Sequence, residues 1–309
     1  MTIEATVIAD SISDGNRLTT LQLRYPRFIH AEAKTHRVIV IDGVLYAEEI
    51  DMGFMDCPDL SRNASSSRAI PVDRLIADLR RDPAMPVYWG GHQPGMQAAA
   101  ELTGVALANV QREWLFAMEQ AIASASIMQQ NGLHKQIANR ILEPWAHINV
   151  IVTATDWENF FALRRHPDAQ PEIKVLADRM HEAMECSVPD FLLPGEWHLP
   201  YTGFDTNDRL HGDFLLSDED QRKVSVARCA RVSYMTHDGK RPTVEADIAL
   251  HDKLVGAVPL HASPAEHQAT PDSRYSSGMG NGRWKHEHEH GNLRGWRQYR
   301  KQLEATVGA

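Results

Sequence analysis

The stretch Ser61-Arg62-Asn63-Ala64-Ser65-Ser66-Ser67-Arg68 is rich in hydroxyl groups and carries two arginines. A second polar cluster, Thr35-His36-Arg37, lies upstream of it. Hydroxyls and exposed backbone amides hydrogen-bond phosphate oxygens, and the guanidinium group is well suited to bidentate contacts with them. The two clusters therefore predict a site for an anionic ligand. On local composition alone, a serine-rich run is more often a solvated turn or linker, so the rest of the chain has to decide between the two interpretations.

Composition limits the classes of function. The chain has 309 residues, which suits one large α/β domain or two modest ones. Its 32 Lys and Arg against 41 Asp and Glu give a formal net charge of −9. We therefore expect no nucleic-acid polymer as a partner, because duplex binding rests on many phosphate contacts. The three cysteines, Cys57, Cys186 and Cys229, lie far apart, which favours a reducing, cytoplasmic location over a disulfide framework or a cysteine zinc site.

Targeting and membrane signals are not expected in this chain. Residues 1–15 lack a basic stretch followed by an apolar one, so no signal peptide is predicted. No run approaches the roughly 18 apolar residues of a membrane span, so we expect no membrane partner. The stretch 188–213 is rich in Pro, Gly and aromatic residues, which is typical of a linker or a long surface loop.

Alternating apolar and polar residues predict strands over 20–28 and 147–154. Two further apolar runs, 38–41 and 44–46, are joined by Asp42-Gly43. A two-residue Asp-Gly connection favours the positive φ angles of a tight turn, so these runs predict a β-hairpin. The acidic segment that follows, up to Leu60, is predicted to be loop.

Apolar residues at helical spacing and end signals predict the helices. The predicted helices cover 72–81, 96–130 with an interruption at Thr103-Gly104 left open, 134–142, 156–165, 169–186, a helix starting at Ser217, and 244–255. The long helix is expected to serve the core or an oligomer contact and to stop at Asn131-Gly132. Capping boxes are predicted at Thr155-x-x-Glu158 and Ser263-x-x-Glu266. A helix start at Ser263 also offers free N–H groups to a phosphate or an anionic cofactor.

One tract has the composition of a metal site. In His286-Glu287-His288-Glu289-His290 the histidines would share a face of a strand. Its Gly-rich surroundings favour an exposed polar loop instead, and we expect no metal. No G-x-G-x-x-G, P-loop or G-x-S-x-G pattern is present, so a Rossmann, kinase or serine-hydrolase site is not supported.

His36-Arg37 followed by Ser61-x-Asn63-x-x-Ser66-x-Arg68 resembles the signature R-H-R-x-x-S-x-N-x-x-S-x-R of flavin-dependent thymidylate synthases. A second block, 140–173, resembles that family's C-terminal half. A third block, made of 230–234 and 261–267, resembles its N-terminal half. The family has this last block first, so the chain resembles a circular permutation, as would suit a phage-type variant. Permutation is tolerated where chain ends lie close together at the surface.

The resemblance implies an α/β (α+β) fold with a mixed sheet flanked by helices, assembled as a homotetramer with active sites between subunits. Residues 1–187 would carry the signature and the long helices, and 188–309 the permuted block, together forming one compact domain. The implied reaction is the reductive methylation of dUMP to dTMP. Methylenetetrahydrofolate would give the carbon, FAD would relay the hydride and NADPH would reduce the flavin. Two alternatives stay open: a paralogue that makes another 5-substituted pyrimidine nucleotide, and a non-catalytic nucleotide- or flavin-binding protein.

The resemblance also implies roles for individual residues. Ser66 matches a serine that contacts the uracil ring, and Arg164 matches an arginine at the pyrimidine edge, so both are expected to be catalytic. The residues implied to bind the substrate are Arg68, Arg140, Glu32 and Ser65. Those implied to bind the flavin are His36, Arg37, Asn63, Asn159, His261, Ser263 and Glu266. Arginine forks suit phosphate and carbonyl oxygens, and placed donors stabilise charge that develops on the ring.

Several features depart from the family's pattern. The departing residues are Glu32 for a frequent Gln, Thr35 for the first Arg, Ala64 for an acidic residue, and Thr153 and Thr155 for an Asn and an Arg that contact the flavin. An insert, 38–60, also separates Arg37 from Ser61, where the family has two residues. We predict that this insert is a hairpin with an acidic loop that extends out from the site. These departures bear on flavin affinity and on the pyrimidine product.

Overall fold

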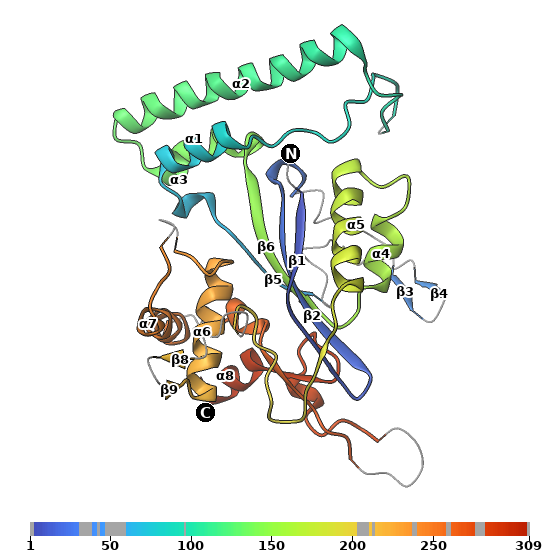
Figure 1. The fold of residues 1–309 in the computed structure, drawn as a ribbon, viewed down its shortest axis with the longest axis vertical. Coiled ribbons are helices and arrows are strands. Elements are labelled where there is room, and N and C mark those ends of the chain that lie inside the picture. The colour runs from blue at the N-terminus through green and yellow to red at the C-terminus, as the bar shows by residue number, and fades with distance from the viewer. Residues whose placement is uncertain are drawn as a thin grey trace.

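A five-stranded mixed β-sheet lies at the centre of the computed structural model, which describes residues 3–30, 39–41, 44–46, 60–95, 97–202, 210–211, 214–236, 240–257, 261–275 and 282–307 (Figure 1). The strand order is β5-β6-β2-β1-β7. The strands are β1 (Glu4–Ser13), β2 (Asn16–Pro26), β5 (Leu60–Ala64), β6 (His147–Ala154) and β7 (Asp190–Phe191). Neighbouring strands are antiparallel except β1 and β7, which are parallel. The predicted α/β fold with a mixed sheet and flanking helices is confirmed.

The alternation along β2 builds an apolar face of the sheet. Leu21, Leu23 and Tyr25 are fully buried and form one cluster with their cross-strand partners on β6. The helices α4 (Glu158–Arg164) and α5 (Pro171–Glu185) cover this face (Figure 1). The predicted alternation is confirmed in both strands, although β2 ends at Pro26 and the chain continues into a 3-10 turn.

The opposite face of the sheet is more polar, because Thr20 and Thr153 point to it and are fully buried. Cys229 and Val232, at the end of α6, pack there on Ile151. The elements on this side are α6 (Asp218–Arg231), α7 (Val244–Val255), the 3-10 turn η5 (Ser263–Glu266), the paired strands β10 (Ala269–Pro271) and β11 (Trp296–Gln298), and α8 (Tyr299–Val307). The described elements from α6 to α8 thus cover the face that α4 and α5 leave open.

A second hydrophobic cluster lies beyond one end of the sheet (Figure 1). It is formed by α1 (Val72–Arg81), α2 (Gly104–Gln130), α3 (Lys135–Ala138) and the 3-10 helix η4 (Asn139–Trp145). The predicted start of the long helix near residue 96 is wrong. Residues 99–102 instead pair by backbone hydrogen bonds with 89–91, so the helix begins only at Gly104. The predicted stop is confirmed, since Gly132 has a left-handed φ of 83°.

The predicted hairpin within the insert is confirmed, because β3 (Ile39–Ile41) and β4 (Val44–Tyr46) pair antiparallel. The acidic loop predicted after it lies outside the described residues. Short strands β8 (Leu210–His211) and β9 (Phe214–Leu215) form another pair. None of the helices in the described ranges is long and apolar enough to cross a membrane.

Both predicted capping boxes are wrong, whereas the predicted cap of α6 by Ser217 is confirmed. Helix α4 begins at Glu158, whose N–H donates to Asp156 Oδ1 at 3.1 Å. The Asp156 carboxylate therefore accepts a hydrogen bond from the first N–H of α4, the capping role that was predicted for Thr155. At Ser263 the chain forms a four-residue 3-10 turn whose N-cap residue is Ala262, with no side-chain capping bond.

Candidate functional site

The serine-rich run begins as an edge strand of the central sheet. In β5, Ser61 lies opposite Thr153 of β6, and Asn63 lies opposite Ile151. Their side chains therefore face α6, while Ala64 packs into the cluster on the other face. The interpretation of this run as a linker is wrong, because its first half is paired in the sheet.

Beyond the strand, the run turns sharply. Ser66 is extended, with φ −98° and ψ 124°, and its Oγ accepts from the N–H and Nε of Arg68 at 3.3 and 3.4 Å. The 3-10 turn η3 (Ser67–Ala69) follows. Ser65 Oγ accepts from Asn149 N–H at 3.1 Å and so fixes the turn to the end of β6. The turn leaves Ser66 half-buried and Arg68 exposed.

Three donors from separate elements converge on one carboxylate oxygen beside this turn. Ser67 Oγ donates to Glu143 Oε1 at 2.6 Å. Arg140 Nη1 lies 3.1 Å from the same oxygen, and Arg27 Nη2 lies 3.2 Å from it. The buried Asn139 donates from Nδ2 to the Ser67 carbonyl at 2.7 Å and thereby fixes the position of the turn. The predicted substrate residues Ser65, Arg68 and Arg140 are thus brought together around η3.

The block from residue 261 onward meets β5 through polar contacts. Gln298 Nε2 donates to Ser61 Oγ at 3.2 Å and to the Glu266 carbonyl at 3.1 Å. Ser61 Oγ donates to Asn292 Oδ1 at 2.9 Å. Asn63 Nδ2 also reaches the carbonyl of Cys229, at the end of α6, at 3.5 Å. Two of the three sequence blocks, far apart along the chain, are therefore adjacent in space.

The end of α6 holds a strained residue. Val232 has φ 55° and ψ 36°, in the left-handed region that a β-branched side chain rarely adopts. Its side chain is buried against the sheet, which fixes it in this conformation. Just before it, Arg228 and Arg231 both pair with the fully buried Asp247 of α7, with Arg228 Nε 3.0 Å from Asp247 Oδ2. The helix ends at this residue, and the Ser233 N–H donates back to the Arg228 carbonyl at 3.2 Å.

A buried chain of hydrogen bonds crosses the polar face of the sheet. Ser11 Oγ lies 2.9 Å from His198 Nδ1, and His198 Nε2 lies 2.8 Å from Thr20 Oγ1. Thr20 Oγ1 lies 2.7 Å from Thr153 Oγ1, which lies 2.8 Å from His267 Nδ1. Burial lowers the pKa of each imidazole to about 3, so both are neutral near pH 7. Thr153, at a position where the family resemblance implied a flavin contact, is enclosed by its two neighbours.

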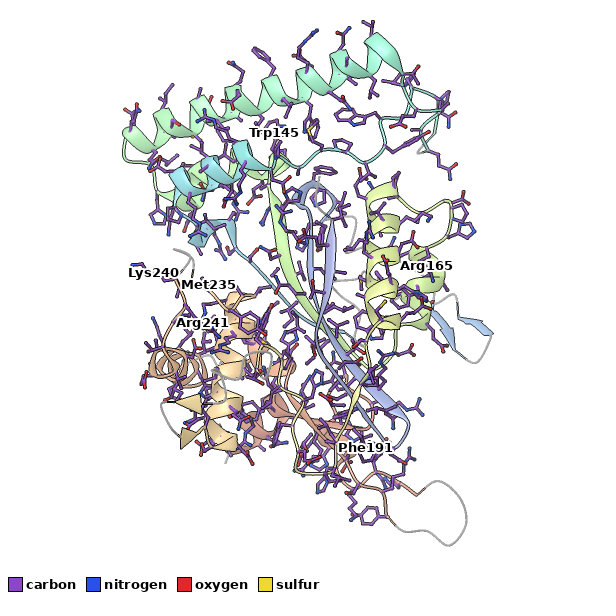
Figure 2. The ribbon with its side chains drawn as sticks, in the orientation of Figure 1. Trp145, Arg165, Phe191, Met235, Lys240 and Arg241 are labelled. Carbon is purple, nitrogen blue, oxygen red and sulfur yellow. The ribbon has the colours of Figure 1, made fainter. Side chains whose placement is uncertain are left out.

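The other expected catalytic residue lies on the far side of the sheet. Arg164 is buried at the end of α4, and burial lowers the pKa of its guanidinium. Asn159 lies on the same helix. In Figure 1, α4 lies beside α5, whereas η3 follows the end of β5 that runs towards α1, and Figure 2 places the neighbouring Arg165 on the α5 side. Helix α4, which carries Arg164 and Asn159, therefore packs on the face of the sheet opposite to the one that the Ser61 and Asn63 side chains face.

The remaining predictions, six for the flavin or the substrate site, divide into three groups. His261 and Ser263 are exposed around η5. Glu266 is half-buried and forms an ion pair with Arg300 of α8. Three of the predicted site residues, Glu32, His36 and Arg37, lie outside the described residues.

A family model described as thymidylate synthase complementing protein matches residues 62–190. Residues 62–190, less than half of the chain, are therefore similar to this family. The match starts in β5 and ends at the start of β7, so this thymidylate synthase complementing segment contains Ser66, Arg68, Arg140 and Arg164. Comparison with curated proteins gives no match.

Two solved structures similar to this chain are both of the UMP/dUMP methylase PolB from Streptomyces cacaoi. One, bound with 5-Br dUMP, has 18% sequence identity and a TM-score of 0.39, and the similarity covers 54% of this chain and 66% of that chain. The other, bound with 5-Br UMP, has 16% identity and a TM-score of 0.44, and the similarity covers 59% of this chain and 88% of that chain. This chain thus spans slightly less than two thirds of the length of the first.

The donor groups beside the thymidylate synthase complementing segment fit a flavin only in part. Ser263 and His261 expose a hydroxyl and an imidazole, which suit a polar cofactor. Thr153 is enclosed and contributes nothing to a ligand, and the Glu266 carboxylate is neutralised by Arg300. A cavity of about 540 Å³ does open beside α4 and is lined by Thr155, but its walls do not include Ser263 or His261.

The His-Glu tract is organised by a carboxylate. Asp272 Oδ1 lies 2.8 Å from His286 Nδ1, and its Oδ2 lies 2.9 Å from His290 Nε2. Burial raises the pKa of Asp272, but hydrogen bonds from His286 and His290 outweigh this and hold it below the ordinary value. Within the described ranges, no group of three or more His, Cys, Asp or Glu side chains is arranged to hold a metal ion. The tract forms the 3-10 turn η6 (Glu287–Glu289) instead of a strand.

The sequence interpretation missed the residues that hold this site together. Glu143 lies within the second block but was given no role, although it joins Ser67, Arg140 and Arg27. Thr153 was treated as a substitution for a cofactor contact, but it belongs to the buried chain. The one sequence signal for Glu143 was a carboxylate three residues after an arginine, which is too common to single it out.

Proposed function

We propose that this protein methylates a uracil nucleotide, converting dUMP to dTMP with methylenetetrahydrofolate as the carbon donor. The similarity of residues 62–190 to the thymidylate synthase complementing family supports nucleotide methylation. The observation that carries the proposal is the set of polar groups around η3. Arg68 and Arg140 suit the phosphate of a nucleotide, and the Ser66 hydroxyl beside them suits the pyrimidine ring.

The proposed cofactor is FAD, with NADPH as its reductant. A bound flavin would supply the hydride chemistry, and this chain's residues would position the reactants. Ser263 and His261 are the described groups left exposed for such a cofactor. Arg164 would then act at the pyrimidine edge, where a buried, desolvated guanidinium interacts strongly with a carbonyl oxygen.

We propose that the complete site forms between subunits of a homotetramer. Support comes from helix α4, which carries Arg164 and Asn159 and packs on the face of the sheet opposite to the Ser61 and Asn63 side chains. It also comes from α2, where Val105, Phe116 and Ile127 are 77%, 56% and 59% exposed. These three residues recur every 11 positions, which is close to three helical turns, so they form one apolar row on the helix.

The test combines flavin binding with product analysis. The purified protein should show flavin absorbance, or acquire it with added FAD. Incubation with dUMP, methylenetetrahydrofolate and NADPH should then yield a nucleotide that is heavier by one methyl group in place of a hydrogen. Failure to bind FAD at all would overturn the proposal.

A second candidate function is the transfer of a different one-carbon group to the pyrimidine. Thr153 favours it, because this residue stands where the resemblance implied a flavin contact but is enclosed by its buried neighbours. The same mass measurement distinguishes a 5-substituted product other than dTMP. The Ser66→Ala variant should lose most of the turnover in either case, because the hydroxyl beside the ring is removed.

A further inference from the structure

A carboxylate occupies the point where the cationic groups around η3 converge. Arg27 from the turn after β2 and Arg140 from η4 both reach Glu143 Oε1, and the Ser67 hydroxyl donates to the same oxygen at 2.6 Å. Two guanidiniums and a hydroxyl are the donor set that proteins use for phosphate. These donors therefore have the arrangement of a phosphate site, and the Glu143 carboxylate occupies the position that a phosphate would take.

We propose that Glu143 is an internal competitor for the ligand's phosphate group. In the free protein its carboxylate takes the anion position between Arg27, Arg140 and Ser67. When a phosphate binds, the carboxylate leaves these donors and turns towards water. The identity of the ligand as a nucleotide rests on the proposed function, whereas the anion site itself rests on the contacts of Glu143.

The exposure of Glu143 and Arg140 makes this exchange feasible. The Glu143 side chain is 22% exposed and the Arg140 side chain is 51% exposed, so both already border solvent. A carboxylate that leaves the site is rehydrated and does not become a buried, unpaired charge. If it stayed, it would lie beside the incoming phosphate, and two like charges at this distance disfavour each other.

Charge also determines which ligands are selected. Arg27, Arg140 and Glu143 together carry a formal charge of +1 because two cations face one anion. A phosphate dianion brings more charge to the two arginines than the carboxylate it displaces, so the exchange is favourable. A neutral nucleoside offers the arginines nothing and leaves Glu143 in place. The site therefore favours the nucleotide over its nucleoside.

The backbone of the turn does not depend on Glu143. Asn139 Nδ2 donates to the carbonyls of Ser67 and Ile70 at 2.7 and 2.9 Å, and Lys135 Nζ donates to the carbonyl of Ala69 at 2.7 Å. These contacts stay when the Glu143 charge is removed. A Glu143→Gln variant keeps the size of the side chain and one oxygen acceptor, so it isolates the effect of the charge.

The experiment measures three ligands on three proteins. The dissociation constants of dUMP, deoxyuridine and inorganic phosphate are determined by calorimetry for the parent, Glu143→Gln and Glu119→Gln. Glu119 is the matched control, because it is a partly exposed carboxylate of α2 that pairs with Arg80 of α1 and not with the η3 donors. Glu143→Gln should bind dUMP and phosphate about tenfold more tightly, with deoxyuridine unchanged. Glu119→Gln should bind all three as the parent does.

Equal or weaker binding of dUMP and phosphate by Glu143→Gln would overturn the proposal, because Glu143 would then only orient the arginines. A failure of the proposed function looks different: dUMP would bind no better than phosphate, yet the variant would still gain affinity for phosphate. If Glu143→Gln does not fold, Glu143→Asp replaces it. Its carboxylate is withdrawn by one methylene, so phosphate affinity should rise above that of the parent, and no rise would overturn the proposal.

Discussion

Thr153 Oγ1 lies 2.8 Å from His267 Nδ1, which links the central strand β6 to the residue that follows η5. Both residues are fully buried, and His267 Nε2 has no hydrogen-bond partner. A lone pair is less costly to leave unpaired than an N–H group. This favours the tautomer in which His267 donates from Nδ1 to Thr153. The hydroxyl therefore determines both the position and the tautomer of His267.

Thr153→Val should destabilise the protein by about 1–3 kcal/mol, because it keeps the side-chain shape but removes the buried partner of His267 and one of the two partners of Thr20. Urea unfolding measures the effect. The control is Thr103→Val, whose exposed hydroxyl makes no capping bond, and it should change stability by less than about 0.5 kcal/mol. Equal stability of the two variants would show that the buried chain contributes nothing.

Acid should destabilise the protein through its buried imidazoles. His198 and His267 have pKa values of about 3 in the folded state, lowered by burial, whereas an unfolded histidine titrates near 6.5. The unfolded state therefore binds more protons between these values. Stability is fully present above about pH 6.5 and falls towards pH 3, with a slope of about 1.4 kcal/mol per pH unit for each imidazole.

The variant His267→Asn tests this pH dependence. Its amide still reaches the Thr153 hydroxyl but does not titrate, so the slope of unfolding free energy against pH should fall by one proton. The exposed His288→Asn should keep the parent's slope. Urea midpoints measured from pH 4 to pH 8 give the comparison, and an unchanged slope in His267→Asn would show that this imidazole does not set the pH dependence.

Arg68→Ala should weaken dUMP binding about tenfold or more, because a charge-assisted hydrogen bond to phosphate is lost. Arg81→Ala is the matched control, since Arg81 is also exposed and lies on the neighbouring helix α1, paired with Asp78. Calorimetry on both variants measures the difference. The assignment of Arg68 fails if the two variants bind dUMP equally well.

The apolar row on α2 should hold subunits together. Phe116→Ser combined with Ile127→Ser should reduce the mass measured by light scattering from an assembly towards a single chain, because burial of apolar surface drives association. Arg74→Ser, an exposed change on α1, should leave the assembly intact. A parent protein that is already a single chain would exclude the proposed homotetramer.

The sequence predicted those elements in which local signals and tertiary contacts agree. Alternation identified β2 and β6, and Asp42-Gly43 identified the hairpin of the insert. The equivalent Asp14-Gly15 turn was missed, although its φ angles of 46° and 77° join β1 to β2. A register shift between Val7 and Ala9 interrupts the alternation of β1, so the pattern on which strand prediction rests was broken there.

For the site, the sequence identified residues whose type matches a ligand, such as Ser66, Arg68 and Arg140. It did not identify Glu143 as the common partner of Arg140, Ser67 and Arg27, because that contact depends on how η1, η3 and η4 pack together. The false capping box at Thr155 has a similar cause. Asp156 satisfies the first N–H of α4, and composition alone does not say which of two neighbouring side chains will do so.

The Thr153 hydroxyl also brings His267, at the end of the third sequence block, beside strand β2, which carries Thr20. His267 and Thr20 lie 247 positions apart in the chain of 309 residues, yet both bond to this one side chain. These contacts join segments that the order of the chain keeps far apart. The order of the blocks along the chain therefore does not determine how they lie in space. Genes that join these segments in a different order can encode the same three-dimensional arrangement.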